Sequence, residues 1–287
     1  MRSKDILHSP RAEELKRAQR VKTRKKVILF AICFLVLVGG LAALSRLDAL
    51  QIDTVAISGT EVLEEKQIRA VVEEELAGTY VWLFSRANTF IYPKNTIERK
   101  LRDTFKIISE LEISHPEIKK IHISIQERKG EYLWCTGGAE GISAENTNCY
   151  FLNADGYIFS NAPYFSGNVY FKFLGGGISD DPIGKQFLTP AKFNALIQLK
   201  KTMYALKLNP SGVEILDNGE YHFILVRSNG QRSNPPKVLI PADFNYEKIV
   251  SNLDSALDAD PLKAQLSKGF PTLQYIDMRF DNKVFYK

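Results

Sequence analysis

The longest apolar run in the chain is Val27–Leu44, eighteen residues without a charged side chain. A helix rises about 1.5 Å per residue, so this run makes a helix of roughly 27 Å, close to the hydrocarbon thickness of a bilayer. The run has no polar face of the kind that a core helix of a soluble protein shows. It therefore predicts a membrane-spanning helix.

A cleaved signal peptide is the alternative interpretation of this run. Its apolar stretch is longer than a usual signal sequence has, and the basic segment before it, residues 1–26, is also long for one. Ala42 and Ala43 offer only weak cleavage chemistry. We therefore favour an uncleaved anchor, followed by a short exit segment at 45–50.

Residues 51–128 begin with a short alternating run that ends at a Ser-Gly-Thr turn and predicts a strand. Apolar positions at helical spacing follow in 64–76, and Pro93 begins a second helical pattern that reaches about Phe105. Tyr80–Phe84, between the two helices, is apolar and is expected to be buried.

Two further runs with strand periodicity close this segment. The first contains Ile108, Leu111 and Ile113, and the second extends from Ile118 to Ile125. We expect them to form a hairpin around His115 and Pro116. The resulting order is strand, helix, helix, strand, strand, which predicts a three-stranded sheet with two helices on its apolar face.

The remainder, residues 129–287, is expected to be mainly β with two helical segments, so the fold class is α+β. Asp217-Asn218-Gly219 is a strong hairpin signal between two of its strands. The helical segments are 190–206 and 244–266, the second interrupted near Pro261. The expected strands are 132–134, 150–152, 157–159, 169–174, 213–216, 221–226, 237–240, 273–280 and 283–286.

Charge is distributed unevenly along the chain. Residues 1–26 hold ten Lys or Arg and three Asp or Glu, so this tail has a charge of +7. The whole chain has a net charge of +5, and the remainder therefore has a charge of −2. Positive charge stays on the cytoplasmic side of a membrane, which predicts that the tail is cytoplasmic and residues 45–287 are outside. The tail also suits anionic lipid head groups. The near-neutral remainder argues against nucleic-acid binding.

Two of the three cysteines, Cys135 and Cys149, belong to the part expected outside. They flank a polar stretch, Thr136–Asn148, and have strand-like residues on either side, so a hairpin would bring them together. A disulfide can persist in that compartment, and two buried free thiols are the alternative. Cys33 lies in the apolar run as an inert filler.

Catalytic motifs are absent from the sequence. There is no metalloprotease, thioredoxin-like, serine-hydrolase or phosphate-loop pattern. The carboxylate pairs at Asp180-Asp181 and at Asp258 and Asp260 stand beside prolines in loop-like sequence, where solvation explains them. Gly175–Gly177 lacks the lysine of a phosphate cradle. We expect no metal site, no cofactor and no enzymatic activity.

The order of elements beyond a single anchor resembles a POTRA domain. Ile121–Arg128, followed by Tyr132-Leu-Trp134, resembles the end of that domain in the FtsQ/DivIB family of bacterial cell-division proteins. Cys149–Phe159 is similar to the family's strand–turn–strand hairpin, with Asn153 where Asp is common. Tyr275–Phe280 resembles the family's closing strand. The implied organisation is a tail at 1–26, a span at 27–44, a linker at 45–50, a POTRA domain at 51–128 and an FtsQ-type β domain at 129–287.

The resemblance implies a single-pass divisome scaffold at the division septum of the cell membrane. Its external β domain would bridge or recruit small coiled-coil partners similar to FtsB and FtsL by adding a strand from them. Arg279 would pair with an acid of the partner, Phe280 would be an aromatic contact, and the final strand would supply the pairing edge. The implied partner-binding residues are Arg279, Phe280, Lys283, Val284, Phe285 and Tyr286.

Other interpretations remain open on the sequence. One is a membrane-anchored cell-wall hydrolase, for which Asp277 and His222 are the pair to test. Another is a POTRA-bearing component of secretion or outer-membrane assembly, although such proteins usually have several POTRA repeats or a membrane barrel. A second candidate edge for strand addition is the strand at about Ile107–Ser114.

Overall fold

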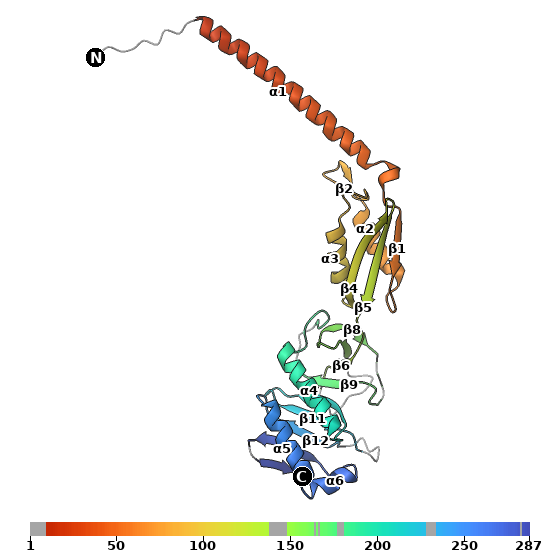
Figure 1. Ribbon diagram of the computed structural model, residues 1–287, viewed down its shortest axis with the longest axis vertical. Helices are drawn as coiled ribbons and strands as arrows, with labels where there is room; N and C mark the ends of the chain where they lie inside the picture. The colour runs from red at the N-terminus through yellow and green to blue at the C-terminus, as the bar shows by residue number, and fades with distance from the viewer. Residues whose placement is uncertain are drawn as a thin grey trace, which may run out of the picture. The chain divides into compact units, whose positions relative to one another are not determined.

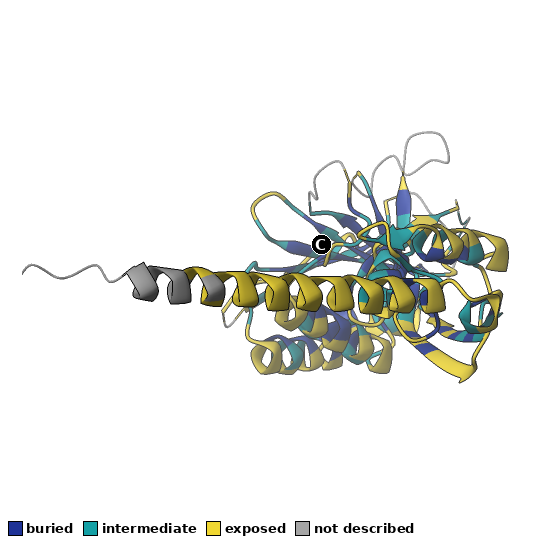
Figure 2. Ribbon diagram, turned by 90° about the horizontal axis from the view of Figure 1, so that it is seen from above, coloured by how far each residue is buried: buried dark blue, intermediate teal, exposed yellow. Residues whose placement is uncertain are grey.

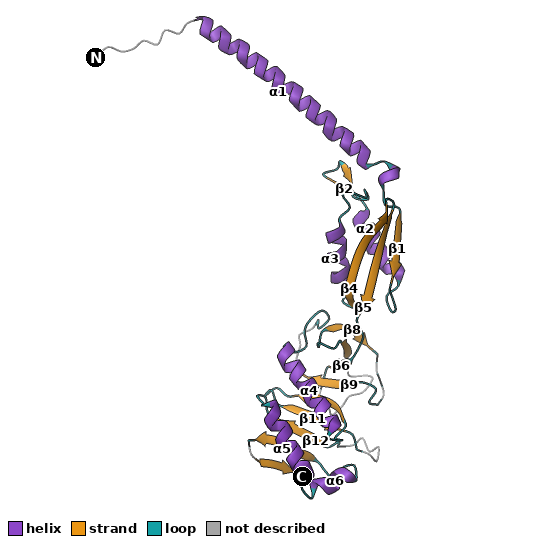
Figure 3. Ribbon diagram, viewed as in Figure 1, coloured by secondary structure: helices purple, strands orange, loops and turns teal. Residues whose placement is uncertain are grey.

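The computed structural model describes residues 10–137, 148–163, 165, 167–176, 181–227, 234–281 and 283–287. It divides into two compact units, and the boundary falls close to Gln126. Unit 1 comprises Met1–Phe105 and Glu110–Gln126, and unit 2 comprises Lys106–Ser109 and Glu127–Lys287. The fold is mixed α+β, with one apolar N-terminal helix and a mostly β C-terminal region, which confirms the expected class (Figures 1 and 3).

The first helix, α1 (Pro10–Ser45), is continuous over 36 residues. Its stretch Gln19–Ser45 has a mean hydropathy of 3.0 and is the single helix in the described part of the chain that is long and apolar enough to cross a membrane. From Gln19 onward its side chains are almost all exposed (Figure 2). Ala42 and Ser45 in the last turn are the buried ones.

Unit 1 contains a three-stranded sheet in the order β1-β5-β4, with β1 parallel to β5. Apolar side chains alternate with exposed ones along these strands, so the sheet has one apolar face, and it is covered by the buried side chains of two helices. The elements are a 3-10 turn Asp48–Leu50, β1 Thr54–Ser58, α2 Glu65–Leu76, β2 Thr79–Tyr80, β3 Phe84–Ser85, α3 Lys94–Thr104, β4 Ile108–Glu117 and β5 Lys120–Glu127.

The turn between β4 and β5 lies further along the chain than expected. β4 continues through His115 and Pro116 to Glu117, and the chain reverses at Ile118 and Lys119. Proline is tolerated here because β4 is at the edge of its sheet, where a missing N–H leaves no ladder bond unmade. Ile118, expected in the second strand, is 54% exposed.

The expected burial of Tyr80–Phe84 is wrong. This segment is the tip of the β2–β3 hairpin, and Val81 and Trp82 are 81% and 89% exposed. The expectation depended on side-chain polarity alone. A tight hairpin turn instead directs the side chains at its tip away from the protein.

Unit 2 contains a nine-stranded sheet in the order β14-β13-β12-β11-β10-β9-β6-β7-β8. Most neighbours are antiparallel, whereas β9 is parallel to both β6 and β10, and β12 is parallel to β13. The strands are β6 Tyr132–Cys135, β7 Cys149–Leu152, β8 Ile158–Ala162, β9 Phe171–Gly175, β10 Pro210–Ile215, β11 Tyr221–Leu225, β12 Lys237–Ile240, β13 Tyr275–Phe280 and β14 Lys283–Tyr286.

Three helices accompany this sheet: α4 (Pro190–Ala205), α5 (Tyr246–Asp258) and α6 (Leu262–Ser267). The second expected helical segment is thus two helices, separated at Pro261. The core is built by apolar side chains of alternate strand positions, such as Phe173 and Phe223, together with helical residues such as Phe193 and Leu253. This face of the strands is committed to the main core. On the other face, a smaller apolar cluster around Leu133 and Leu174 covers β6, β7 and β9, whereas polar groups such as Glu214, His222 and Asp277 lie on β10, β11 and β13.

Cys135 and Cys149 lie opposite each other in the β6–β7 hairpin and are joined by a disulfide. Of the segment between them, residues 138–147 lie outside the described residues, as do Gly177 in the glycine run, Asp180 of the acidic pair and Asn282 of the last turn. Asn153 begins the β7–β8 turn, and its side-chain oxygen accepts hydrogen bonds from the N–H groups of Asp155 and Tyr157 at 3.0 and 2.8 Å. Asn thus forms the turn that an Asp usually makes.

Candidate functional site

The last strand, β14, is an edge strand of the nine-stranded sheet. Tyr275 and Lys287 exchange both backbone hydrogen bonds, at 3.3 and 3.2 Å, so they are a hydrogen-bonded pair of the antiparallel ladder. Such pairs alternate with pairs that do not bond across the ladder. The N–H and C=O groups of Tyr286, and by the same alternation those of Val284, therefore point away from β13 toward the open edge.

The two faces of β14 differ in character. Val284 packs on the core and, with Tyr286, lines a groove of about 330 Å³ beside α5, whose wall includes Asn252 and Ala256. Phe285 is on the opposite face and is 47% exposed. A strand added at this edge would meet a groove on one face and an aromatic surface on the other.

That aromatic surface consists of Phe280 and Phe285. Their ring centroids lie 4.9 Å apart in an edge-to-face arrangement, and Phe280 is 51% exposed. Phe280 is opposite Lys283, after an irregularity in the pairing of β13 and β14. The structure thus brings the predicted Phe280, Lys283, Val284, Phe285 and Tyr286 together at one end of the sheet.

Arg279, the remaining predicted site residue, is already paired within the chain. Its Nε and Nη2 donate to the two carboxylate oxygens of Asp277 at 2.9 and 2.7 Å, and its Nη1 donates to Glu220 at 3.0 Å. These bonds use three of the five N–H groups of the guanidinium. Arg279 can accept a further carboxylate only by sharing its charge with two acids that it already binds.

Asp277 is the buried member of this cluster, at 5% exposure. Hydrogen bonds from Arg279 hold the pKa of the Asp277 carboxyl below its ordinary value, although burial acts in the opposite direction. Asp277 is therefore a carboxylate at neutral pH, and it fixes the guanidinium plane of Arg279.

The polar face of the sheet continues from Asp277 toward its middle. Leu239 lies opposite both Asp277 and His222, and His222 lies opposite Glu214. Burial lowers the pKa of the His222 imidazole, which favours the neutral ring at neutral pH. Among the described atoms, His222 Nε2 has no hydrogen-bond partner, so this nitrogen makes no bond to Asp277, the acid expected to orient it in a hydrolase. A general base oriented by a carboxylate needs that bond.

Two members of this site escaped the sequence analysis: Glu220 and the wall of α5. Glu220 directly follows the Asp217–Gly219 turn. The sequence there predicts a hairpin and does not indicate a partner for Glu220. Its bond to Arg279 spans 59 positions in the sequence and reaches across β12, the strand that lies between β11 and β13 in the sheet. Pairings of that kind depend on strand order, which local patterns do not encode.

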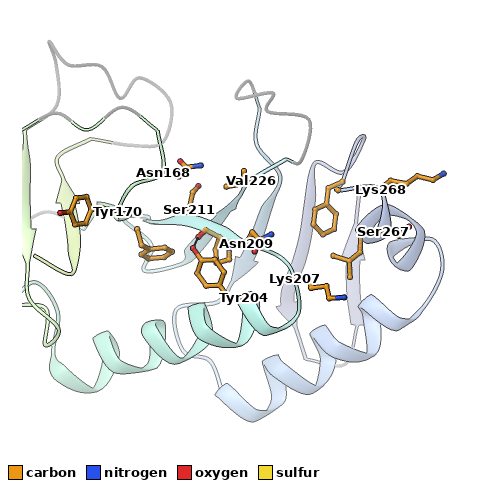
Figure 4. Close-up of a pocket in the computed structure, with 14 residues that line it drawn as sticks. Asn168, Tyr170, Tyr204, Lys207, Asn209, Ser211, Val226, Ser267 and Lys268 are labelled. Carbon is orange, nitrogen blue, oxygen red and sulfur yellow. Dashed lines mark hydrogen bonds between the residues drawn. The ribbon is translucent and has the colours of Figure 1, made fainter.

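Another cavity of about 600 Å³ lies elsewhere in unit 2 (Figure 4). It is lined by a mixture of side chains, including Tyr170, Asn209, Val226 and Lys268, and none of the predicted site residues is among them. Within the described ranges, no group of three or more His, Cys, Asp or Glu side chains is arranged to hold a metal ion. The edge at β14 is therefore the better candidate site.

The other predicted edge is in unit 1. β4 is an edge strand of the sheet β1-β5-β4, at the position expected for 107–114. No protein-family model and no curated protein matches this chain. The family resemblance therefore stays a hypothesis that depends on the motifs in the sequence.

Proposed function

We propose that this protein is a single-pass membrane protein that binds a partner by accepting a β-strand along β14, as a scaffold of bacterial cell division similar to the FtsQ/DivIB family. The observation that carries the proposal is the open edge of β14, flanked by exposed aromatic side chains. Backbone groups supply affinity in strand addition, and side chains on the two faces supply specificity.

The membrane part of the proposal is supported by α1. Apolar side chains from Val27 to Leu44 are exposed on this helix, which is unfavourable in water and favourable in lipid. Basic residues precede the span, so the N-terminus is assigned to the cytoplasm and units 1 and 2 to the outside. In this proposal residues 51–128 are the POTRA domain and 129–287 the partner-binding β domain.

The chemistry of the partner follows from the two faces of the edge. The incoming strand would form backbone hydrogen bonds with Val284 and Tyr286. Alternate side chains of that strand would meet Phe280 and Phe285 on one face and the groove beside α5 on the other. An acid on the first face would approach the remaining donors of Arg279. A strand of an FtsB-like or FtsL-like protein with apolar and acidic residues fits this description.

The hydrolase alternative has less support. It requires Asp277 to orient His222, whereas both oxygens of Asp277 accept bonds from Arg279. The ring of His222 is half-buried on β11, and this burial lowers its pKa. We therefore argue only the binding function further.

The decisive test compares Tyr286→Pro with Tyr286→Ala in the full-length protein in membranes. Both changes remove the ring, and only proline also removes the outward N–H. Proline is tolerated on an edge strand at a position whose N–H makes no ladder bond. We expect co-purification of the FtsB-like partner to fall about tenfold more for the proline variant, which corresponds to one charge-neutral hydrogen bond of about 1.4 kcal/mol.

Septal localisation of a fluorescent fusion at the N-terminus gives the second measurement. It should be retained by Tyr286→Ala and weakened in Tyr286→Pro, with unchanged protein levels. Equal co-purification for both variants would contradict strand addition at β14. Undiminished septal localisation in cells depleted of the FtsB-like and FtsL-like proteins would contradict the part played by those partners.

A further inference from the structure

Unit 1 carries an apolar surface that the proposed function does not use. We call it the membrane-proximal patch, and it consists of Val81, Trp82, Leu83, Phe90 and Ile91. Their exposures are 81, 89, 41, 77 and 40%. Scattered single apolar residues on a surface need no explanation, but large ones gathered on two adjoining loops mark an interaction surface.

Both loops are tied to the last turn of α1. Arg46 donates from Nη2 to the carbonyl of Trp82 at 2.9 Å, and the N–H of Ser85 donates to Ser45 Oγ at 3.3 Å. The buried side chain of Asn88 donates to the carbonyl of Ser45 at 3.2 Å. The hairpin and the loop that contains Phe90 are therefore fixed at the end of the helix (Figure 1).

The depth of the hairpin along α1 follows from Ala42. This residue belongs to the apolar run, yet it is 7% exposed where nearly all its neighbours on the helix are open. Strand β3 is the element that contacts α1. The hairpin therefore lies beside the final turn of the apolar run, at the level where a membrane-spanning helix leaves the hydrocarbon.

The turn holds its two exposed side chains in a defined direction. Val81 and Trp82 both have positive φ, 48° and 60°, and the N–H of Leu83 donates to the carbonyl of Tyr80 at 2.9 Å. Tyr80–Leu83 is thus a β-turn with both central residues in the left-handed region, inside a three-residue connection between β2 and β3. Val and Trp at the tip are displayed outward by the backbone conformation.

We propose that the membrane-proximal patch inserts into the interfacial layer of the bilayer, so that unit 1 is seated on the lipid surface beside α1. The occupant is lipid because the patch continues the apolar surface of the helix at its exit level. Trp prefers this layer, where its ring is apolar and its N–H reaches water. Arg46, at the same level, suits the phosphates of the head groups. This inference depends on the proposed membrane span.

The test uses the two tryptophans of the chain. Trp134 is buried in unit 2 at 2% exposure, so the fluorescence difference between the wild type and Trp82→Phe reports Trp82 alone. The full-length protein is reconstituted in vesicles of phosphatidylcholine and phosphatidylglycerol that carry bromine near the head-group end of the acyl chains. We expect loss of most of the difference signal to bromine quenching, and little quenching of it by aqueous iodide.

A second variant keeps the outcomes distinct. Phe34→Trp in the Trp82→Phe background places a probe near the middle of the apolar run of α1. If lipids brominated deep in the chains quench this probe while Trp82 is quenched by iodide alone, α1 spans the bilayer and the lipid-insertion inference is overturned in favour of a protein partner for the patch. If neither probe is quenched by brominated lipid, the span and the inference both fail.

Discussion

Arg279 links the end of β13 to the start of β11 through a single side chain. It clamps the buried Asp277 with two hydrogen bonds and holds Glu220 with a third. The bidentate geometry fixes the orientation of the guanidinium plane. At the scale of residues, the buried carboxylate of Asp277 therefore holds Arg279, a residue of the candidate site, in place.

Replacing the carboxylate of Asp277 tests how much it contributes to the stability of the fold. Asp277→Asn keeps the shape and removes the charge, and we expect a loss of about 1.5–3 kcal/mol in the free energy of unfolding at pH 7. The measurement is urea unfolding in the Trp82→Phe background, where Trp134 fluorescence reports unit 2. Asp258→Asn is the matched control, since its carboxylate is 79% exposed and its partner Lys263 is 3.9 Å away. That control should change stability by less than about 0.5 kcal/mol.

The same pair of proteins has a defined pH dependence. The pKa of Asp277 is lowered in the folded state, so its contribution is complete above the ordinary value of about 3.9 and is lost as pH falls through the lower folded-state value. The stability gap between wild type and Asp277→Asn should be constant from about pH 5 to 8 and should narrow below about pH 4. A gap that persists unchanged at pH 2 would contradict the charged hydrogen bond as its origin.

At the scale of elements, the periodicity of apolar positions predicted the order of the helices and strands in both units, except for the short strands β2 and β3. The bounds of β10, β11 and β12 lie close to the predicted runs because alternating burial is a local property. The turn after β4 was misplaced because Pro116 reads as a breaker, and its tolerance depends on the strand being at an edge. The burial predicted for Val81 was wrong because the polarity of a side chain does not show that it stands at the tip of a hairpin.

The β6–β7 hairpin contains a disulfide whose contribution to stability can be measured. Its disulfide closes a loop of sequence separation 14, which the chain-entropy model values at about 3 kcal/mol. We expect Cys135→Ser combined with Cys149→Ser to lower the free energy of unfolding by about that amount in urea. Cys33→Ser, on the exposed surface of α1, is the control and should leave it unchanged.

Reduction provides an independent check on the hairpin. Dithiothreitol should destabilise the wild type and leave the double variant unaffected. If the double variant were as stable as the wild type, the bond would contribute nothing to the fold, and packing by Leu133 and Leu174 around the cysteines would account for the hairpin alone.

At the scale of the whole molecule, one helix separates a basic segment from two folded units. The sequence predicted this division because charge and apolar length are additive properties of a segment. It did not reveal the membrane-proximal patch, since Trp82 and Phe90 become neighbours of the α1 end only through the hydrogen bonds of Ser45 and Arg46. It named most of the β14 site because that site is almost contiguous in sequence.

A further prediction concerns the orientation of the chain in the membrane, which we expect the basic residues before the span to set. Changing Lys22, Arg24, Lys25 and Lys26 to Gln removes the charges next to the span and should produce a mixture of orientations. Protease added to intact spheroplasts should then degrade only part of the folded units, whereas we expect it to degrade those of the wild type completely. Exchanging the same four residues between Lys and Arg keeps the charge and should change nothing. Full accessibility of the Gln variant would mean that these charges do not set the orientation.

The turn at Val81 and Trp82 has an energetic cost for the folded protein. Left-handed conformations of non-glycine residues cost on the order of 1–3 kcal/mol each, and a β-branched residue is among the least suited to them. Asn-Gly would make the same hairpin without that cost. Val81 and Trp82 are therefore a costly pair for the fold at this position. Under the lipid-insertion proposal, the contacts of these two side chains with the bilayer offset that cost.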